Sequence, residues 1–423
     1  MNTDSEYCLE LQTTDMKFFH VTSLEDCKKT VEEHLPKSAL AKTNKTTADA
    51  VNFVLAEDVK SPDFFPPYTR STVDGFAIRA EDAYCSSASI PAFLKIKGKI
   101  LMGEMPSISL EKGEAIQIAT GGVLPKGANA VVMVENVEEL GGELAVYSPV
   151  KQWENTVLYG EEVKPNDVIA KRGEVVTPLM VGVFSSVGIE RVNVYDKIKV
   201  AIISTGDELV SVSEKAENGK IRDVNTSLLT AMLVDDGYEV VNFVRIPDNE
   251  ELFRAALSNA LEKADWVLVS GGSSIGAKDL TEKVLSSGEI LLHGLALKPG
   301  KPTIIAKFGE KTVFGLPGNP FAALCVFQTI CHSVLQSARG EKQPFLYAYT
   351  ATNFPSSPGR TTLQPVKVEF DGDKYLATPI FLKSAHLYSA LKADGYVVLP
   401  ETAEGMYGGT LIKVYPFSNK GIL

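Results

Sequence analysis

The stretch 198–209, IKVAIISTGDEL, shows the unit that decides the fold of this chain, and residues 198–340 repeat that unit. Each copy is a short apolar run, then a loop rich in glycine or acids, then a helical pattern. The apolar runs are 198–203 (IKVAII), 239–244 (EVVNFV), 266–269 (WVLV) and 312–316 (TVFGL). Runs that are apolar on both sides of the pleat are typical of buried parallel strands. The pattern predicts a central α/β domain built on an open parallel sheet.

The loops after these runs carry most of the candidate functional residues. They read STGDEL (204–209), RIPDN (245–249), SGGSSIGAKD (270–279) and LPGNP (316–320). The loops that leave the carboxyl ends of parallel strands share one edge of the sheet, and ligands bind there. We therefore expect four acids to converge with two glycine-rich turns. These acids, which are candidate ligands for a hard cation such as Mg2+, are Asp207, Glu208, Asp248 and Asp279.

Two further features of this domain indicate an anionic ligand. Asn319 can cap a helix whose first residue is Pro320, which leaves free backbone donors at the helix start. Lys298 and Lys301 flank a Pro-Gly turn, and the stiffness of that turn favours an oxyanion site over two solvated surface lysines. Neither glycine loop has the GxGxxG or GxxxxGK[ST] spacing, which disfavours a nicotinamide dinucleotide or P-loop site.

The flanking parts of the chain predict three more domains. An amphipathic helix between Ser23 and Pro36 and a helix over 178–187 suggest a discontinuous N-terminal domain, 1–45 with 150–185. Residues 46–60 suggest a helix leading into a strand. Alternating segments over 92–149 and a Gly141-Gly142 turn predict an inserted β module, taken as 46–149. The central domain is then 186–340, and 341–423 is a C-terminal β-barrel domain with a hairpin at Asp371-Gly372.

Two stretches outside the central domain offer polar groups. The proline-rich segment 61–79 holds Arg70, Ser71 and Asp74, and it is either a ligand-binding loop or a plain connection. The turn at Thr120, in IATGG, can hold an anion through its backbone N–H groups or can be a simple turn. In the C-terminal domain the polar candidates are Arg360 and the segment 384–389.

Composition narrows the class of protein. The 423 residues carry a net charge of −11, which argues against a general nucleic-acid binder. The five cysteines are scattered and form no Cys-x-x-Cys pair, so we expect reduced thiols in a cytoplasmic protein. The N-terminus shows no signal-peptide pattern, and we expect no membrane-spanning segment.

Seven motifs in order resemble those of the molybdenum insertases, the family of bacterial MoeA and the gephyrin E domain. They are RSTVDGFA, QIATGGVLPKGANAVV, STGDEL, SGGSSIGAKD, LKPGKP, GLPGNP and GRTTL, and together they span almost the whole chain. The resemblance implies a four-domain homodimer whose central domain is a doubly wound α/β unit, shared with molybdopterin adenylyltransferases. It also implies an active site completed by the β module of the second subunit.

The resemblance further implies a reaction and a set of roles. Adenylylated molybdopterin and molybdate would give molybdenum cofactor and AMP with the help of Mg2+. The implied catalytic residues are Asp74, Thr120, Glu208, Asp248 and Asp279, and the acids named above would hold the metal. The substrate-binding residues, from the resemblance and from the loop chemistry, are Ser270, Gly271, Gly272, Ser274, Gly276, Lys298, Lys301, Pro317, Gly318, Asn319, Pro320, Arg360 and Ser384. Transient partners would be a molybdopterin adenylyltransferase and apo-molybdoenzymes.

The chain departs from the family pattern at several places. Val73 and Phe76 replace the usual Met and Tyr, the loop at 270–279 differs at Ser273, Ile275 and 277–278, and LKSAHLYS replaces a QGSGML-like segment. Three alternatives therefore stay open. They are a tungstate-preferring paralogue, a gephyrin-like scaffold without catalysis, and a CinA-like nucleotide hydrolase that shares only the central fold.

Overall fold

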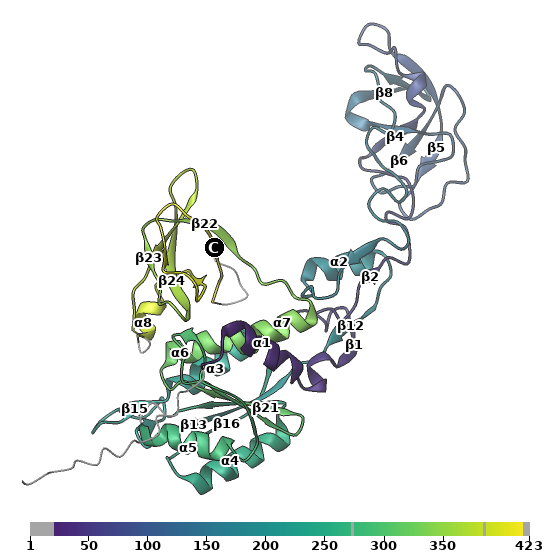
Figure 1. Ribbon diagram of the computed structural model, residues 1–423. Coiled ribbons are helices and arrows are strands. Elements are labelled where there is room, and N and C mark those ends of the chain that lie inside the picture. The colour runs from purple at the N-terminus through teal and green to yellow at the C-terminus, as the bar shows by residue number, and fades with distance from the viewer. Residues whose placement is uncertain (1–20, 272–274, 384–385, 418–423) are drawn as a thin grey trace, which may run out of the picture. The chain divides into compact units, whose positions relative to one another are not determined.

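The computed structural model describes residues 21–271, 275–383 and 386–417, and it describes no side chain in 272–279 (Figure 1). The chain divides into two compact units. One contains residues up to Thr43 together with Tyr195–Leu423, and the other is Asn44–Val194. Each unit is described by itself below.

A six-stranded sheet forms the middle of the first unit, in the order β16-β13-β17-β21-β20-β18. Its parallel strands are the predicted ones: β13 (Lys199–Thr205), β16 (Glu239–Ile246), β17 (Trp266–Ser270) and β21 (Lys311–Leu316). Two strands that the repeat does not predict, β18 (Glu289–His293) and β20 (Ile304–Phe308), add antiparallel to one edge. The apolar runs thus confirm the predicted parallel sheet and extend it.

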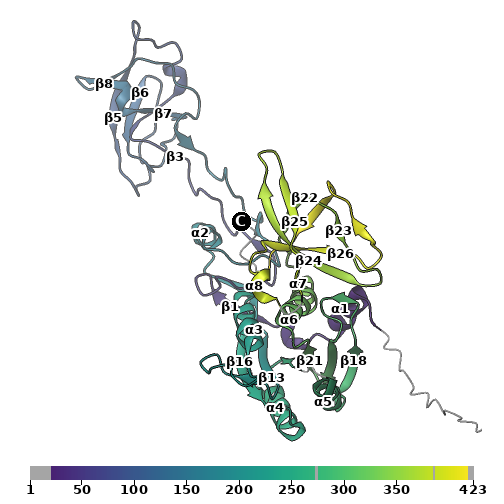
Figure 2. The ribbon, with the colours of Figure 1, turned by 90° about the vertical axis from the view of Figure 1, so that its left-hand side faces the viewer.

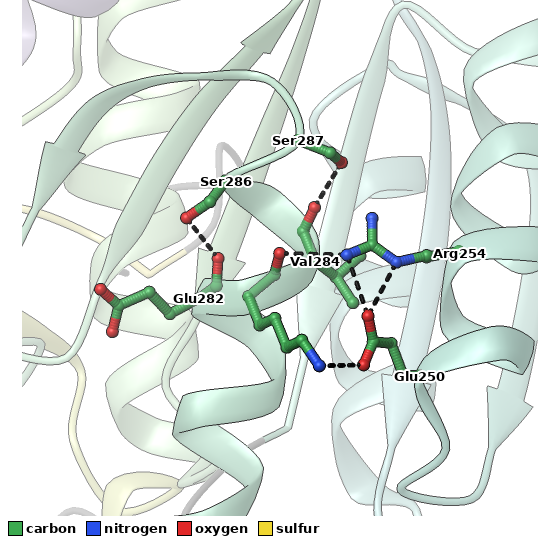
Figure 3. Close-up of polar contacts among 7 residues, drawn as sticks. Glu250, Arg254, Glu282, Val284, Ser286 and Ser287 are labelled. Atoms are coloured by element: carbon green, nitrogen blue, oxygen red, sulfur yellow. Dashed lines mark hydrogen bonds and ion pairs between the residues drawn. The ribbon is translucent and has the colours of Figure 1, made fainter.

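Helices cover both faces of this sheet, as a doubly wound fold requires (Figures 1 and 2). On one face lie α4 (Glu250–Lys263) and α5 (Ile275–Leu285), packed on Ala201, Ile203 and Val269. Lys283 of α5 joins the two helices: its Nζ donates to the Glu250 carboxylate at 2.5 Å, and its carbonyl oxygen accepts from the Arg254 Nη2 at 3.4 Å. Within α4, the Arg254 Nε donates to Glu250 at 3.0 Å (Figure 3). The hydrogen bonds from Lys283 and Arg254 lower the pKa of Glu250, which keeps the carboxylate charged.

The other face is covered by α1 (Leu24–Glu33), α3 (Val224–Asp235) and a 20-residue helix, Pro320–Arg339. That helix consists of α6 (Pro320–Val326), the π-helical turn η4 (Phe327–His332) and α7 (Ser333–Arg339). It is long and apolar enough to cross a membrane by length and composition, but 83% of its most apolar window is buried inside the fold. Such burial is typical of a helix in the core of a fold.

Helix α1 confirms the expected N-terminal helix, with Ser23 as its N-cap accepting from the Asp26 N–H at 3.1 Å. Its buried face, Leu24, Cys27 and Val31, packs against η4 and α7. Residues 21–43 lie in the same compact unit as the central sheet, where the apolar face of α1 is buried.

The C-terminal β domain belongs to the same unit. Its sheet has the order β19-β24-β25-β22-β28, with β26 paired to β24. The Asp371-Gly372 hairpin is confirmed, because the Asp371 carboxylate accepts from the N–H groups of Asp373 and Lys374 at 2.9 and 2.8 Å. A short helix, α8 (Leu387–Ala390), lies between β25 and β26 in the chain. The strands are β19 (Leu297–Lys298), β22 (Leu346–Thr350), β23 (Phe354–Pro355), β24 (Thr361–Phe370), β25 (Tyr375–Pro379), β26 (Gly395–Leu399), β27 (Gly405–Met406) and β28 (Leu411–Val414).

The second unit is built around another six-stranded sheet, in the order β7-β4-β6-β5-β9-β8. The expected hairpin at Gly141-Gly142 is present, since Leu140 pairs with Glu143. Gly75 lies where a Cβ would come within 2.0 Å of the Val132 carbonyl oxygen, so β4 and β7 can pair only with glycine there. The strands are β4 (Gly75–Ile78), β5 (Ala92–Ile100), β6 (Glu114–Ile118), β7 (Ala130–Met133), β8 (Val137–Leu140) and β9 (Glu143–Val146).

The remainder of this unit is a set of short paired strands and one helix. Helix α2 (Pro178–Ser186) starts at the Thr177 N-cap and confirms the expected helix. The helix expected within 46–60 is wrong: the chain there makes hydrogen-bonded turns, because Thr46 caps the N–H of Asp49 and the short run of apolar residues does not complete a helical face. The short strands are β2 (Val59–Lys60), β3 (Arg70–Ser71), β10 (Thr156–Val157) and β11 (Val168–Ala170).

Candidate functional site

A crevice opens at the carboxyl edge of the central sheet, where the loops after β13, β17 and β21 meet. The strand register sets this edge: Ser204 lies beside Ser270, and Ser270 beside Leu316. The crevice has a volume of about 310 Å³. Its lining residues include Ser204, Thr205, Glu208, Arg222, Asp223, Asn225, Ser270, Gly271, Gly318, Asn319 and Pro320. Five of the predicted substrate-binding residues thus line one cavity: Ser270, Gly271, Gly318, Asn319 and Pro320.

Asn225, which the sequence analysis does not single out, holds two of these loops together. Its Nδ2 donates to the Ser270 Oγ at 2.6 Å and to the Gly318 carbonyl oxygen at 2.8 Å. Its Oδ1 is buried without a hydrogen-bond partner among the described residues. A buried amide oxygen without a partner costs free energy, and the two hydrogen bonds that Nδ2 donates hold the side chain in place. The signal in the sequence is the pair of polar residues Asp223 and Asn225 at the start of α3, where Asp223 is the N-cap.

Gly271 allows the close approach of the β17 loop to β13. A Cβ at this position would lie 2.6 Å from both the carbonyl oxygen and the Oγ1 of Thr205. Any side chain would push the two strand ends apart. The packing of the two strand ends alone therefore requires glycine at the first position of the SGG sequence, whether or not a ligand contacts it.

The predicted acids come together only in part. The Asp207 carboxylate accepts from the Asp248 N–H at 3.1 Å, and the Asp248 carboxylate accepts from the Thr205 Oγ1 at 3.2 Å. Glu208 lines the crevice, whereas Asp207 and Asp248 do not. Among the side chains that the structure describes, no group of three or more His, Cys, Asp or Glu is arranged to hold a metal ion. The described donors alone do not fit the expected Mg2+ site.

Several predicted site residues lie outside the described part of the chain. Gly272, Ser274 and Ser384 are not described, and neither is Ser273. Gly276 and Asp279 lie within helix α5 by their backbone, but the side chain of Asp279 is not described. Their roles stay predictions.

Helix α6 begins at the crevice, with Asn319 at its N-cap and Pro320 at its first position, as expected. The Asn319 side chain makes no capping hydrogen bond to the helix. The backbone N–H groups of the first helical turn therefore remain as donors beside Gly318.

A second cavity, the cation pocket, adjoins the crevice at Asn319 and has a volume of about 470 Å³. It lies between the Lys298–Lys301 turn and the C-terminal domain, because β19 pairs in parallel with β24, Leu297 with Thr361 and Lys298 with Thr362. The Lys298 Nζ donates to the Ser357 Oγ at 2.6 Å. The lining residues include four cations and no carboxylate, within the part of the chain that the structure describes; the cations are Lys298, Lys301, Arg360 and Lys383.

The cation pocket brings Arg360 together with Lys298 and Lys301, although Arg360 lies 59 positions after Lys301 in the chain. In a protein of net charge −11, four positive side chains without a lining carboxylate indicate an anionic ligand. Sequence reasoning missed Lys383, Ser356 and Thr362, which line the same cavity. Pro317, which the sequence also predicts as a substrate-binding residue, lines the cation pocket.

The two predicted residues of the second unit contact each other. Both the backbone N–H and the Oγ1 of Thr120 donate to the Asp74 Oδ1, at 2.8 and 3.2 Å. The stiff loop before Asp74 is ordered by Ser71, whose Oγ donates to the Val73 carbonyl oxygen at 2.6 Å. The turn at Thr120 thus has a defined partner in the segment 61–79.

Comparison with known proteins assigns the family. Three family models match consecutive parts of the chain: "MoeA N-terminal region (domain I and II)" over 22–188, "Probable molybdopterin binding domain" over 201–337, and "MoeA C-terminal region (domain IV)" over 347–417. The molybdopterin molybdenumtransferase of Haemophilus influenzae is 32% identical over 379 residues, which cover 88% of this chain and 93% of that protein.

Solved structures agree with this assignment. Two crystal structures of molybdopterin biosynthesis MoeA proteins from Pyrococcus horikoshii superpose with TM-scores of 0.77 and 0.79, at 35% and 29% identity. They cover 94% and 93% of this chain and 100% of the solved chains. The fold and the site thus define a class: a multidomain protein with an α/β domain, β domains and a cleft lined by cations. The chain belongs to the MoeA family.

Proposed function

We propose that this protein is a molybdopterin molybdenumtransferase that uses adenylylated molybdopterin and molybdate. In the proposed reaction water hydrolyses the phosphoanhydride bond of adenylylated molybdopterin, and AMP leaves. The two dithiolene thiols bind the molybdenum of molybdate, and one molybdate oxygen leaves with their two protons as water. The observation that carries the proposal is the pair of adjoining cavities. One offers hydroxyl, amide and backbone donors at a helix start, and the other offers four cations.

The two cavities suit the two parts of such a reaction. Phosphate oxygens are bound well by backbone N–H groups at a helix N-terminus, as in the loop at Gly318. A tetrahedral dianion such as molybdate is bound well by charge-assisted hydrogen bonds from Lys and Arg, as from Lys298, Lys301 and Arg360. Because both cavities include Asn319, a substrate that carries a phosphate group and a metal-binding group can reach both.

The roles of the acids remain part of the proposal. Glu208, Asp248 and Asp279 are proposed as catalytic groups, and Asp74 and Thr120 as a further pair, supported by the hydrogen bonds that join them. We also propose that the reaction requires Mg2+, and the assay below measures that requirement. A homodimer in the cytoplasm, with transient contacts to a molybdopterin adenylyltransferase and to apo-molybdoenzymes, completes the proposal.

The test is the release of AMP from adenylylated molybdopterin by the purified protein, with and without molybdate and Mg2+. We expect molybdate-dependent AMP release and molybdenum bound to the pterin product. Intact substrate after incubation with both ions would contradict the proposal. The same assay with tungstate separates a molybdate enzyme from a tungstate-preferring paralogue. The matches over three consecutive regions favour the insertase over a CinA-like hydrolase.

A further inference from the structure

Two short strands carry the chain between its two compact units. The chain enters the second unit after Thr43 and leaves it before Tyr195. The strands at these two crossings, β1 (Lys42–Thr46) and β12 (Arg191–Tyr195), pair with each other as a two-stranded sheet, which we call the ribbon. Because the chain crosses nowhere else, the direction in which the ribbon leaves the first unit limits the positions open to the second unit.

Hydrogen bonds at both ends of the ribbon hold its two strands together. At the end in the first unit, the Asp196 N–H donates to the Ala41 carbonyl oxygen at 2.9 Å. At the end in the second unit, the Thr47 N–H donates to the Glu190 carbonyl oxygen at 2.9 Å. The two strands therefore move as one element, and a contact at the first-unit end can orient both of them.

One buried side chain, Arg339 at the end of α7, holds the first-unit end of the ribbon. Its Nε donates to the Ala39 carbonyl oxygen at 3.0 Å, and its Nη2 donates to the Asp196 carbonyl oxygen at 2.5 Å. Ala39 comes shortly before β1, and Asp196 comes directly after β12. The guanidinium carbon also lies 5.2 Å from the ring centre of Tyr195, the last residue of β12. A single guanidinium thus contacts the chain on both sides of its excursion into the second unit.

The chemistry of this contact favours an orienting role over simple packing. Arg339 is only 6% exposed, and a buried charge costs free energy that its hydrogen bonds must offset. Both recorded hydrogen bonds go to main-chain carbonyls, so they fix the path of the backbone. The planar guanidinium holds two such acceptors in one geometry. An apolar side chain could fill the same space without the cost of burying a charge, but it could not hold the two carbonyl groups.

We propose that Arg339 is a positioning residue that sets the direction of the ribbon and so limits the movement of the second unit. The second unit carries the Asp74–Thr120 pair, and Arg339 therefore acts on that pair through the ribbon. The inference goes beyond the proposed function, because it concerns a residue far along the chain from the pair and holds for any reaction in which the pair takes part.

The test measures the distance between the two units in the full chain. Spin labels are attached to Cys85 in the second unit and to Glu262→Cys on α4 in the first, both exposed positions, with Cys8→Ser to restrict the labelling. The other described cysteines are buried. Labelled chain is mixed with an excess of unlabelled chain, so that only distances within one chain are recorded. Pulsed electron paramagnetic resonance then gives the distribution of this distance.

The decisive variant is Arg339→Met, with Val334→Ala as the matched control. Val334 is a buried residue of the same helix, and its apolar side chain cannot bind the carbonyls of the ribbon. We expect Arg339→Met to broaden the distance distribution and to speed amide hydrogen exchange at Asp196 about tenfold, because charge-assisted hydrogen bonds to this segment are lost. Val334→Ala should lower the thermal midpoint and leave the distribution unchanged.

Two results would overturn the positioning role of Arg339. They are a distribution in Arg339→Met as narrow as in wild type, and an equal broadening in Val334→Ala, which would make the effect one of stability alone. Arg339→Lys keeps the charge and loses the planar fork, so we expect an intermediate distribution. If Arg339→Met does not fold, Arg339→Lys is judged by the same two criteria.

Enzyme kinetics link the position of the second unit to the reaction. We expect Arg339→Met to lower kcat for AMP release about tenfold, because misplaced catalytic groups react more slowly. The KM for molybdate should stay the same, since the cation pocket lies wholly in the first unit. A rise in this KM as large as the fall in kcat would mean that the pocket itself is damaged, and would overturn the link.

The distance measurement needs no substrate, so it separates the positioning role from the proposed function. If Arg339→Met broadens the distribution but wild type releases no AMP, the positioning role stands and the insertase function fails. If wild type releases AMP in a molybdate-dependent way and the two distributions are equal, the function stands and the positioning role fails.

Discussion

At the scale of single residues, Asn225 is the side chain on which the crevice depends most. It joins the Ser270 hydroxyl to the Gly318 carbonyl, and these belong to two different loops. We predict that Asn225→Ala lowers kcat/KM for AMP release by on the order of 10², because small displacements of substrate-positioning groups have effects of that size. Steady-state kinetics with the thermal midpoint as control will check this. A fall of less than threefold would contradict it.

A second prediction at this scale concerns the buried carboxylate of Asp236. Burial, and next the charge of Asp235, raise the pKa of Asp236 to about 7. Around it lie His332, whose Nε2 is 3.6 Å from the carboxylate, and Gln328, which donates to it at 3.3 Å. Burial also raises the pKa of Glu341 to about 7. A raised pKa means that the folded state binds the proton of the acid more tightly than the unfolded state does. The contribution of these two acids to the free energy of unfolding is therefore greatest below about pH 4, and it is lost as the pH rises through 7.

We therefore predict that Asp236→Asn stabilises the protein at pH 8 by about 2 kcal/mol relative to wild type and has little effect near pH 4. Because Glu341 remains, part of the pH dependence should persist. Urea unfolding at several pH values measures the difference. An Asp236→Asn variant that is less stable than wild type at pH 8 would contradict the assignment, and would mean that Asp236 is held charged by His332.

At the scale of elements, the parallel strands could be predicted and the edges of the sheet could not. β13, β17 and β21 are apolar on both faces because helices cover both sides, and that burial is visible as unbroken apolar runs. The antiparallel strands β18 and β20 were not predicted, because EILLH and IIAKF lack a repeat unit of their own. The turns at 46–60 were mistaken for a helix, since Thr46 and Asp49 act as turn residues there.

Trp266 on the central strand β17 offers a test of how this sheet packs. Trp266 is fully buried and lies edge-on to Phe314, with ring centroids 5.3 Å apart. We predict that Trp266→Ala lowers the free energy of unfolding by about 3–5 kcal/mol. Trp266→Phe should cost clearly less, because the indole Nε1 is buried without a partner among the described residues and its removal leaves no broken hydrogen bond. Equal costs for the two variants, measured by denaturant unfolding, would contradict this.

At the scale of the whole molecule, the sequence predicts many residues of the candidate site, but it does not predict that they line two separate cavities. Ser270 and Asn319 each follow a strand of the repeat, so the repeat alone predicts that they lie at the carboxyl edge of the sheet. The cation pocket does not follow, because Lys298 and Arg360 are joined only by the pairing of β19 with β24. The role of Asn225 shows only in the structure, where its side chain joins the Ser270 hydroxyl to the Gly318 carbonyl.

The proposed dimer is also tested at this scale. Helix α2 buries only Phe184, while Leu179 is 79% exposed, and exposed apolar side chains of this size are suited to an interface. We predict a mass of about twice the 45.7 kDa chain by light scattering, and a shift towards the monomer for Leu179→Asp. A wild-type protein that stays a monomer at micromolar concentration would contradict the dimer.

The measurement that tests the central claim most directly is the molybdate dependence of AMP release, compared between wild type and Lys298→Ala. Lys298 belongs to the cation pocket and not to the crevice, so the variant should keep its affinity for adenylylated molybdopterin and lose affinity for molybdate. We predict saturable, molybdate-dependent AMP release in the wild type, with a KM for molybdate about tenfold higher in Lys298→Ala and a difference that shrinks at high salt. AMP release that is independent of molybdate, or identical molybdate curves for the two proteins, would contradict the claim that the adjoining cavities hold the two substrates.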